Sequence, residues 1–206
     1  MLKIWGRTNS INVQKVMWAV AELGLPHERI DVGGPFGGLD TAEYKAKNPN
    51  SRIPTIDDNG VIVWESNAVV RYLAARYGAG RLWPIDPAHR SESDRWMDWQ
   101  QSTIAPDMFP VFWGLIRTPP EKRDLAAVKA AAERLAASWS LLDRHLGDRI
   151  YVAGADFTMG DIPVGCAFWR YTKLDVAKPR LANCDAWHQR LQERPGFRQH
   201  VTLPLS

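Results

Sequence analysis

Residues 51–67 bring a proline, a carboxylate and a hydroxyl close to the start of a predicted helix. Pro54 opens a short apolar segment, a turn follows, and a second apolar segment leads directly into Glu65-Ser66. A hydroxyl and a helix N-terminus attract a carboxylate, because the helix exposes unpaired N–H groups there. The carboxylate of Glu65 in turn attracts an amine. The segment therefore suits a zwitterionic peptide that has a free carboxylate and a free amine.

A second polar cluster, Thr8-Asn9-Ser10-Ile11-Asn12, joins the first predicted strand to the first predicted helix. Ser and Asn commonly cap helices, so a purely structural role is one interpretation. In an α/β unit, however, ligands sit beyond the carboxyl ends of strands, and this turn follows such an end. Ser10 and Asn12 are therefore candidate catalytic residues as well as candidate caps.

The composition is that of an ordinary globular protein, with 45% hydrophobic and 24% charged residues in a chain of 206. The 26 basic and 23 acidic residues are interspersed, so we expect no nucleic-acid partner. The first residues are too polar for a signal peptide, and no apolar run reaches the about 18 residues of a membrane span. We expect a cytoplasmic protein with no membrane partner.

Several catalytic motifs are missing from the sequence. No Gly-Lys-Ser/Thr follows the Gly-rich segment 33–38, the five histidines lack His-Glu-x-x-His spacing, and there is no Gly-x-Ser-x-Gly. Cys166 and Cys184 do not form a Cys-x-x-Cys pair, so we expect neither a disulfide scaffold nor a metal site. These absences argue against hydrolysis.

The first 77 residues are predicted to form an α/β unit in the order β-α-β, α, β-β-α. Apolar spacing and turn residues predict strands at 2–5, 27–32, 53–56 and 61–64, and helices at 13–23, 41–47 and 65–77. Asn59-Gly60 is the dipeptide expected in a hairpin turn, and Gly33–Gly38 is expected to be a mobile loop.

Beyond a linker at 78–85 the sequence becomes all-helical. Asp86 followed by Pro87 predicts a helix start, and that helix must kink or break at Pro106 and Pro110. The next helix is predicted to start at 118–121 and to bury an apolar stripe that runs to residue 146.

Phe157-Thr158-Met159-Gly160-Asp161 predicts one more helix start. Thr158 would cap the helix, and Asp161 would reach back as in a capping box. This segment is interpreted as structural, without a part in the chemistry.

These features together resemble the cytosolic glutathione S-transferases, of a serine-type, theta-like or nu-like class. The resemblance rests on residues 5–16, 52–72 and 157–161. It implies an α/β thioredoxin-like N-terminal domain (1–77) and an all-α C-terminal domain (86–206). It also implies an enzyme of detoxification that uses glutathione as co-substrate, needs no metal, and joins the thiolate to small electrophiles.

The resemblance gives two candidates for stabilising the thiolate. Ser10 stands where the serine-type classes have their catalytic hydroxyl. Asn12-Val13-Gln14-Lys15-Val16 matches part of the Thr-Pro-Asn-Gly-x-Lys-Val turn of other bacterial and fungal relatives, which makes Asn12 the second candidate. Lowering a thiol pKa of about 8.5 by two units requires about 2.7 kcal/mol, which one charge-assisted hydrogen bond and the helix dipole can supply. No cysteine precedes Cys166, which argues against the thiol-reductase and isomerase branches.

The remaining glutathione contacts also follow from the resemblance. Pro54 matches the family's cis-proline, which directs the backbone of Ile53 toward the cysteinyl backbone of glutathione. Glu65 and Ser66 match the pair that holds the γ-glutamyl end, by its ammonium and its carboxylate respectively. Arg52 and Asn67 are further candidates for this site.

In such proteins the acceptor binds between the two domains. Met108, Phe109, Phe112 and Trp113 are candidates for an apolar wall, and Arg117 for attracting an anionic acceptor. A structural role for these residues, as the core of a kinked helix, is the alternative.

The family also implies a homodimer, built on the helix after Glu65 and the first helix of the second domain. Two other functions stay open. One is a glutathione-dependent dehalogenase or peroxidase on the same site. The other is a non-catalytic glutathione- or ligand-binding protein, and retention of the Glu65-Ser66 pair favours catalysis over that role.

Overall fold

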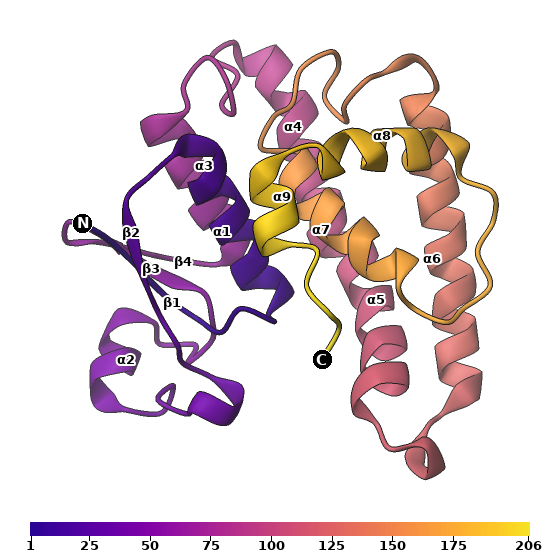
Figure 1. Cartoon of the computed structure of the whole chain (residues 1–206), viewed down its shortest axis with the longest axis horizontal. Helices are drawn as coiled ribbons and strands as arrows, with labels where there is room; N and C mark the ends of the chain where they lie inside the picture. The colour runs from indigo at the N-terminus through magenta and orange to yellow at the C-terminus, as the bar shows by residue number, and fades with distance from the viewer.

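In the computed structural model, which describes residues 1–206, a four-stranded sheet lies beside a group of helices (Figure 1). The strands are β1 (Leu2–Trp5), β2 (His27–Ile30), β3 (Thr55–Asp58) and β4 (Val61–Trp64). Their order is β2-β1-β3-β4, with β2 parallel to β1 and the other neighbours antiparallel. This mixed sheet with its helices is the predicted thioredoxin-like arrangement.

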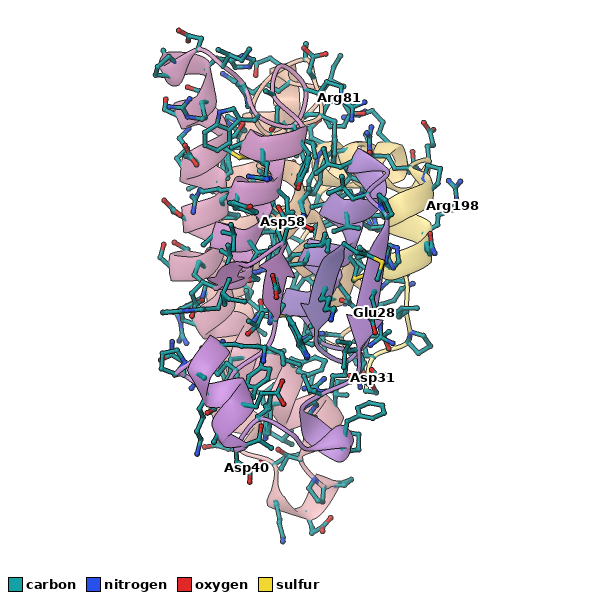
Figure 2. All side chains as sticks on the ribbon, turned by 90° about the vertical axis from the view of Figure 1, so that its left-hand side faces the viewer. Glu28, Asp31, Asp40, Asp58, Arg81 and Arg198 are labelled. Atoms are coloured by element: carbon teal, nitrogen blue, oxygen red, sulfur yellow. The ribbon has the colours of Figure 1, made fainter.

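Two helices cover one face of the sheet, α1 (Ile11–Leu23) and α3 (Ser66–Tyr77). Ile4 and Ile56 are paired across β1 and β3, and both pack against Val13, Val16 and Leu73 of these helices. In Figure 1 the two helices separate the sheet from the rest of the molecule. Figure 2 looks at the molecule from the sheet side, where α2 (Ala42–Lys47) lies at the lower end.

The helical half contains the remaining α-helices. They are α4 (Pro87–Trp99), α5 (Ala105–Phe112), α6 (Leu125–His145), α7 (Asp161–Thr172), α8 (Ala182–Gln192) and α9 (Pro195–His200). Its core is a cluster of 33 buried residues that also includes Trp18 and Ala19 of α1 and Val70 and Ala74 of α3. The two halves thus share apolar packing through α1 and α3.

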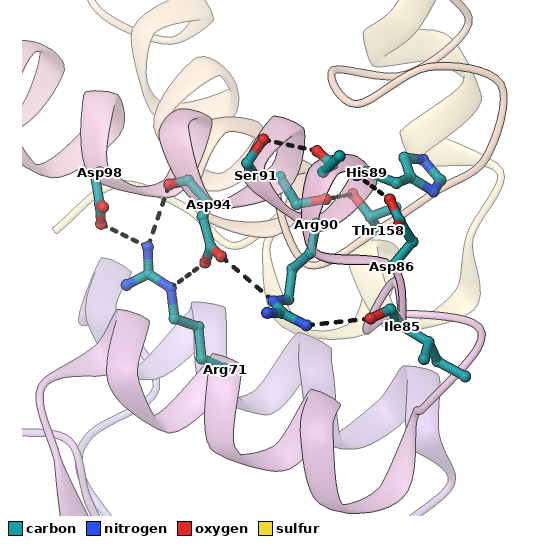
Figure 3. Close-up of polar contacts among 11 residues, drawn as sticks. Arg71, Ile85, Asp86, His89, Arg90, Ser91, Asp94, Asp98 and Thr158 are labelled. Carbon is teal, nitrogen blue, oxygen red and sulfur yellow. Dashed lines mark hydrogen bonds and ion pairs between the residues drawn. The ribbon is translucent and has the colours of Figure 1, made fainter.

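A polar contact joins the halves as well. Arg71 of α3 is ion-paired with Asp94 and with Asp98 of α4, at 2.6 Å in each case (Figure 3). The guanidinium therefore holds α3 against α4, because it binds two carboxylates of α4.

Most predicted elements occur, with displaced ends. The third strand begins at Thr55 and not at residue 53, and β2 ends at Ile30 because its partner β1 is only four residues long. The hairpin turn at Asn59-Gly60 is confirmed, with φ of 54° and 94°. The predicted loop 33–38 contains a short 3-10 turn, η1 (Gly34–Phe36).

The α-helix predicted from residue 86 changes to a π-helical turn before the first proline. A π-helical segment, η2 (Gln100–Ile104), separates α4 from α5, and the helical backbone continues through it without a break. Pro106 is the second residue of α5, and because proline lacks an N–H it cannot bond to the preceding turn. Pro110 lies inside α5, and a second π-helical segment, η3 (Trp113–Arg117), follows. π-helical turns of this kind often lie at functional sites.

The predicted helix starts have mixed outcomes. Asp86 caps α4 as predicted, since its carboxylate accepts from the N–H of His89 at 2.8 Å. The start predicted at 118–121 is wrong: that segment contains a 3-10 turn, η4 (Pro120–Lys122), and Asp124 caps α6.

The capping box at the start of α7 is partly confirmed. Asp161 reaches back to the N–H of Thr158 at 3.0 Å, but Thr158 Oγ1 accepts from Gly160 rather than from the third residue on.

Candidate functional site

The turn before α1 exposes two uncommitted donors. Ser10 is the N-cap residue, yet its side chain makes no capping hydrogen bond, so the hydroxyl is available to a ligand. Asn12, in the first turn of α1, lines a cavity between the two halves. Both side chains are half-buried.

Lys15 is the centre of a buried polar network. Its ammonium is fully buried and donates to Gln100 Oε1 at 2.8 Å, and to Ser66 Oγ and Asn67 Oδ1 at 3.4 Å each. Burial lowers the pKa of Lys15 to about 8, and the charge of Arg170 acts in the same direction. The network connects α1, α3 and η2, and so spans both halves of the molecule.

In the sequence analysis Lys15 is part of the segment Asn12–Val16 and has no role of its own. The signal that could have placed it is helical spacing. Ile11, Trp18 and Ala19 stand four residues before, three after and four after Lys15, and these positions share one face of a helix. A lysine in the middle of an apolar face requires buried partners.

The network has a fixed direction at Asn12. An ammonium can only donate, so Ser66 Oγ accepts from Lys15 and directs its own proton to Asn12 Oδ1, at 3.2 Å. With its oxygen engaged, the Asn12 amide has only N–H groups left to offer. Asn12 is thereby oriented as a hydrogen-bond donor.

The backbone before β3 has the predicted geometry. The Ile53–Pro54 peptide bond is cis, as predicted. The carbonyl of Arg52 accepts from the hydroxyl of Tyr44 at 2.7 Å and from Nδ2 of Asn48 at 2.9 Å, which holds the preceding loop. The Arg52 side chain itself is exposed.

Glu65 has an unusual backbone conformation. It is the N-cap of α3 with φ 66° and ψ 113°, a sparsely populated region for a residue with a side chain, and its carboxylate is exposed. The next residues turn inward: Ser66 is 5% exposed, and Asn67 donates to the carbonyl of Met97 at 2.8 Å while accepting from Lys15. The amide of Asn67 is therefore committed to both halves of the structure.

The cavity beside Asn12 has a volume of about 160 Å³ and lies between α1, η2, α5 and α7. Met108, Phe109 and Phe112 line it, as predicted for an acceptor wall, and Arg170, which was not predicted, lines it too. Trp113 is outside the lining, 45% exposed and stacked on Phe109. Arg117 is also outside, with its guanidinium over the Phe112 ring at 5.5 Å.

A larger hollow of about 540 Å³ between α6 and residues 175–179 contains none of the polar groups above, so it is not the candidate site. No group of three or more His, Cys, Asp and Glu side chains comes together in a metal-binding arrangement. None of the helices combines the length and the apolar character that crossing a membrane requires.

Comparison with known proteins identifies relatives along the whole chain. The family model described as glutathione S-transferase, N-terminal domain, matches residues 9–76, and that described as glutathione S-transferase, C-terminal domain, matches residues 126–200. Glutathione S-transferase GstB of Escherichia coli (strain K12) is 41% identical over 208 residues, covering 100% of each chain.

Solved structures agree with this match. A theta class glutathione S-transferase from Xanthomonas axonopodis pv. citri, with glutathione bound, has a TM-score of 0.96 and 42% identity, over 100% of this chain and 99% of that one. Glutathione transferase F7 of Populus trichocarpa shares the fold, with a TM-score of 0.87 at 19% identity over 97% of each chain.

Proposed function

Because the chain belongs to the glutathione S-transferase family, we propose that it joins the sulfur of glutathione to an electrophilic carbon of a small acceptor bound in the cavity beside Asn12. The single observation that carries this proposal is the place of Asn12, which lines that cavity two residues after the free hydroxyl of Ser10 at the start of α1. The reaction forms a carbon–sulfur bond as the leaving group departs with its electron pair, and the thiol proton passes to solvent.

Glutathione is proposed to lie along the edge formed by Arg52, Ile53 and cis-Pro54, where the backbone of Ile53 pairs with its cysteinyl unit. The exposed carboxylate of Glu65 takes the γ-glutamyl ammonium. The free N–H groups at the start of α3 take the γ-glutamyl carboxylate, with Ser66 contributing its backbone N–H. Asn67 then supports the site from behind through Lys15 and does not touch the ligand.

The hydroxyl of Ser10 and the amide of Asn12 are proposed to donate to the sulfur. Both donors sit at the positive end of α1, which also favours an anion. The Lys15–Ser66–Asn12 relay keeps the Asn12 amide in the donor orientation. Met108 and Phe112 form the apolar wall for the acceptor, and Trp113 and Arg117 close it from the outside.

We further propose that the enzyme acts in detoxification in the cytoplasm, as a homodimer of two-domain subunits with domains at 1–77 and 86–206. The dimer would form on α3 and α4, next to the edge strand β4, whose Val61, Ile62 and Trp64 are exposed by 42%, 37% and 36%. Light scattering on the purified protein measures its mass in solution, and a homodimer should have twice the mass of the chain.

The thiolate assignment is tested by titrating the ultraviolet absorbance of enzyme-bound glutathione. Ser10→Ala and Asn12→Ala should each raise the thiol pKa by about one unit, the loss of one charge-assisted hydrogen bond, with little change in glutathione affinity. Thr8→Ala, two residues upstream and exposed, is the matched control. If neither variant moves the titration, the sulfur is not held at this turn.

A further inference from the structure

Three arginines from separate elements lie at or near the acceptor cavity. Arg170 from α7 lines it together with Asn12. Arg117 from η3 lies just outside, with its guanidinium over the same Phe112 ring as that of Arg170, at 5.5 and 4.0 Å. Arg7, from the turn after β1, is near enough for its charge to act on Arg170. Their charges act on one another, since Arg117 and Arg7 both lower the pKa of Arg170, and Arg117 lowers that of Arg7. The acceptor site therefore has a strongly positive side.

No carboxylate side chain neutralises this cluster. Arg170 is 9% exposed and makes no hydrogen bond or ion pair; its guanidinium lies on the Phe112 ring at 4.0 Å. Nη1 of Arg7 donates to Asn9 Oδ1 at 2.6 Å, while its Nε is buried without an acceptor. Nη2 of Arg117 donates to the main-chain oxygen of Ser206 at 2.7 Å, so Arg170 is the member of the cluster whose side chain has no hydrogen-bond partner.

Two other partly buried arginines of this chain are paired with acids. Arg194 binds both carboxylate oxygens of Glu22, at 2.9 and 2.6 Å, and Arg71 binds two aspartates. Burying an unpaired charge is costly, and the cost is recovered when an oppositely charged group arrives. Burial and like charge lower the pKa of Arg170 to about 10, so it remains protonated at neutral pH.

Resting on the proposed function, we propose that the acceptor is an anion: a small electrophile with a carboxylate that pairs with Arg170, assisted by Arg117 and Arg7. A guanidinium binds a carboxylate by two parallel hydrogen bonds, which fixes orientation as well as affinity. Because Asn12 and Arg170 line the same cavity, the carboxylate at Arg170 directs the opposite, reactive end toward the sulfur. Phe112 and Met108 hold the apolar part between them.

A matched pair of acceptors tests the charge alone: 4-chloro-3-nitrobenzoate and the neutral 4-chloro-3-nitrobenzamide. In both, the thiolate attacks the ring carbon that carries chlorine, the carbon–sulfur bond forms, and chloride leaves with the bonding pair. The carboxylate or amide takes no part in the bond changes. The readout is the ratio of kcat/KM for benzoate over benzamide, with each value divided by its uncatalysed rate with glutathione.

We expect the wild-type ratio to be about ten or more. Arg170→Met should lower the ratio by about tenfold or more, because it removes one charge-assisted pair. Arg117→Gln, at a less buried position, should lower it in the same direction and covers the case that Arg170→Met does not fold. Arg144→Gln removes an exposed charge on α6 and should leave the ratio unchanged.

Two results separate the possible failures. If the wild type turns over neither acceptor, the proposed function fails. If the wild type turns over both acceptors, and Arg170→Met and Arg117→Gln keep the wild-type ratio, the anionic acceptor is refuted while the transferase function stands. A rise in the glutathione Kd of Arg170→Met, measured calorimetrically, with no change in the ratio would assign the cluster to a carboxylate of glutathione instead, and would also refute the proposal.

Discussion

Because the ammonium of Lys15 is buried, it should make the unfolding free energy depend on pH in a way that an exposed lysine does not. In the folded protein burial lowers the pKa of Lys15 from 10.5 to about 8. In the unfolded chain the ammonium is in water and keeps the ordinary value. Between these two values the unfolded state binds more protons than the folded state, so raising the pH through this window stabilises the folded state.

The size of the effect follows from the two pKa values. At pH 7 the protonated, buried Lys15 costs about 3.4 kcal/mol relative to a group with no shift, since each pKa unit is worth about 1.36 kcal/mol. At pH 9.5 Lys15 is mostly neutral in the folded state, and the same arithmetic leaves a cost of about 1.4 kcal/mol. The wild type should therefore gain about 2 kcal/mol between pH 7 and pH 9.5 relative to a variant that lacks this group.

Lys15→Met is that variant, because methionine fills a similar volume without a charge. Guanidinium unfolding followed by tryptophan fluorescence, at one protein concentration and at each pH, gives the difference in unfolding free energy between wild type and variant. Other titrations cancel in this difference.

Lys45→Met, at an exposed position, is the control and should give a difference that does not vary with pH. If the Lys15→Met difference changes by less than about 0.5 kcal/mol over the same range, the buried-ammonium argument is refuted.

Two further residues give sharp tests. Glu65→Gly and Glu65→Ala should both weaken glutathione binding about tenfold in calorimetry. The glycine variant should have an unfolding free energy about 1 kcal/mol higher than the alanine variant, because φ 66° strains only a residue with a side chain. Equal unfolding free energies of the two variants would contradict the strain. Asp161→Ala should lower the unfolding free energy by about 3 kcal/mol, since it leaves three buried N–H groups, of Val152, Thr158 and Trp187, without an acceptor. Burial raises the pKa of Asp161 to about 6 from 3.8, so wild type should lose stability relative to Asp161→Asn as the pH rises from about 4 to 6, and a flat difference would contradict this.

The elements that local chemistry determines could be predicted from the sequence. Asn59-Gly60, Asp86-Pro87 and the reach of Asp161 back to Thr158 each depend on residues within a few positions of one another, and the structure has all three. The start of α6 differs from the prediction because Pro119-Pro120 resembles a helix start, whereas Asp124, four residues after Pro120, caps the helix.

Ser10, Asn12, Ser66 and Asn67 could be predicted from the resemblance, but the buried charges beside them depend on distant segments and could not. Lys15 reaches residues 51, 52 and 85 positions away, and no local pattern contains that information. Arg170 was absent from the predicted site for the same reason, since α7 reaches the cavity only through tertiary packing. Trp113 was predicted as a wall residue because it is apolar and near Phe112, yet the π-helical turn η3 leaves it outside.

The positive side of the cavity also bears on how the proposed reaction would proceed. A thiolate and an anionic acceptor repel each other: at about 6 Å, with an effective dielectric constant of about 20, the repulsion is about 2.8 kcal/mol. A neutral site would add this to the barrier of every turnover. Arg170, which lines the cavity and is held on the Phe112 ring, would offset part of this term without moving. The buried ammonium of Lys15, fixed by Gln100, Ser66 and Asn67, would add a positive charge behind Asn12. The arginine cluster is thus expected to act on kcat as well as on KM for the benzoate, and a loss confined to KM in Arg170→Met would show that it binds the acceptor without easing the approach.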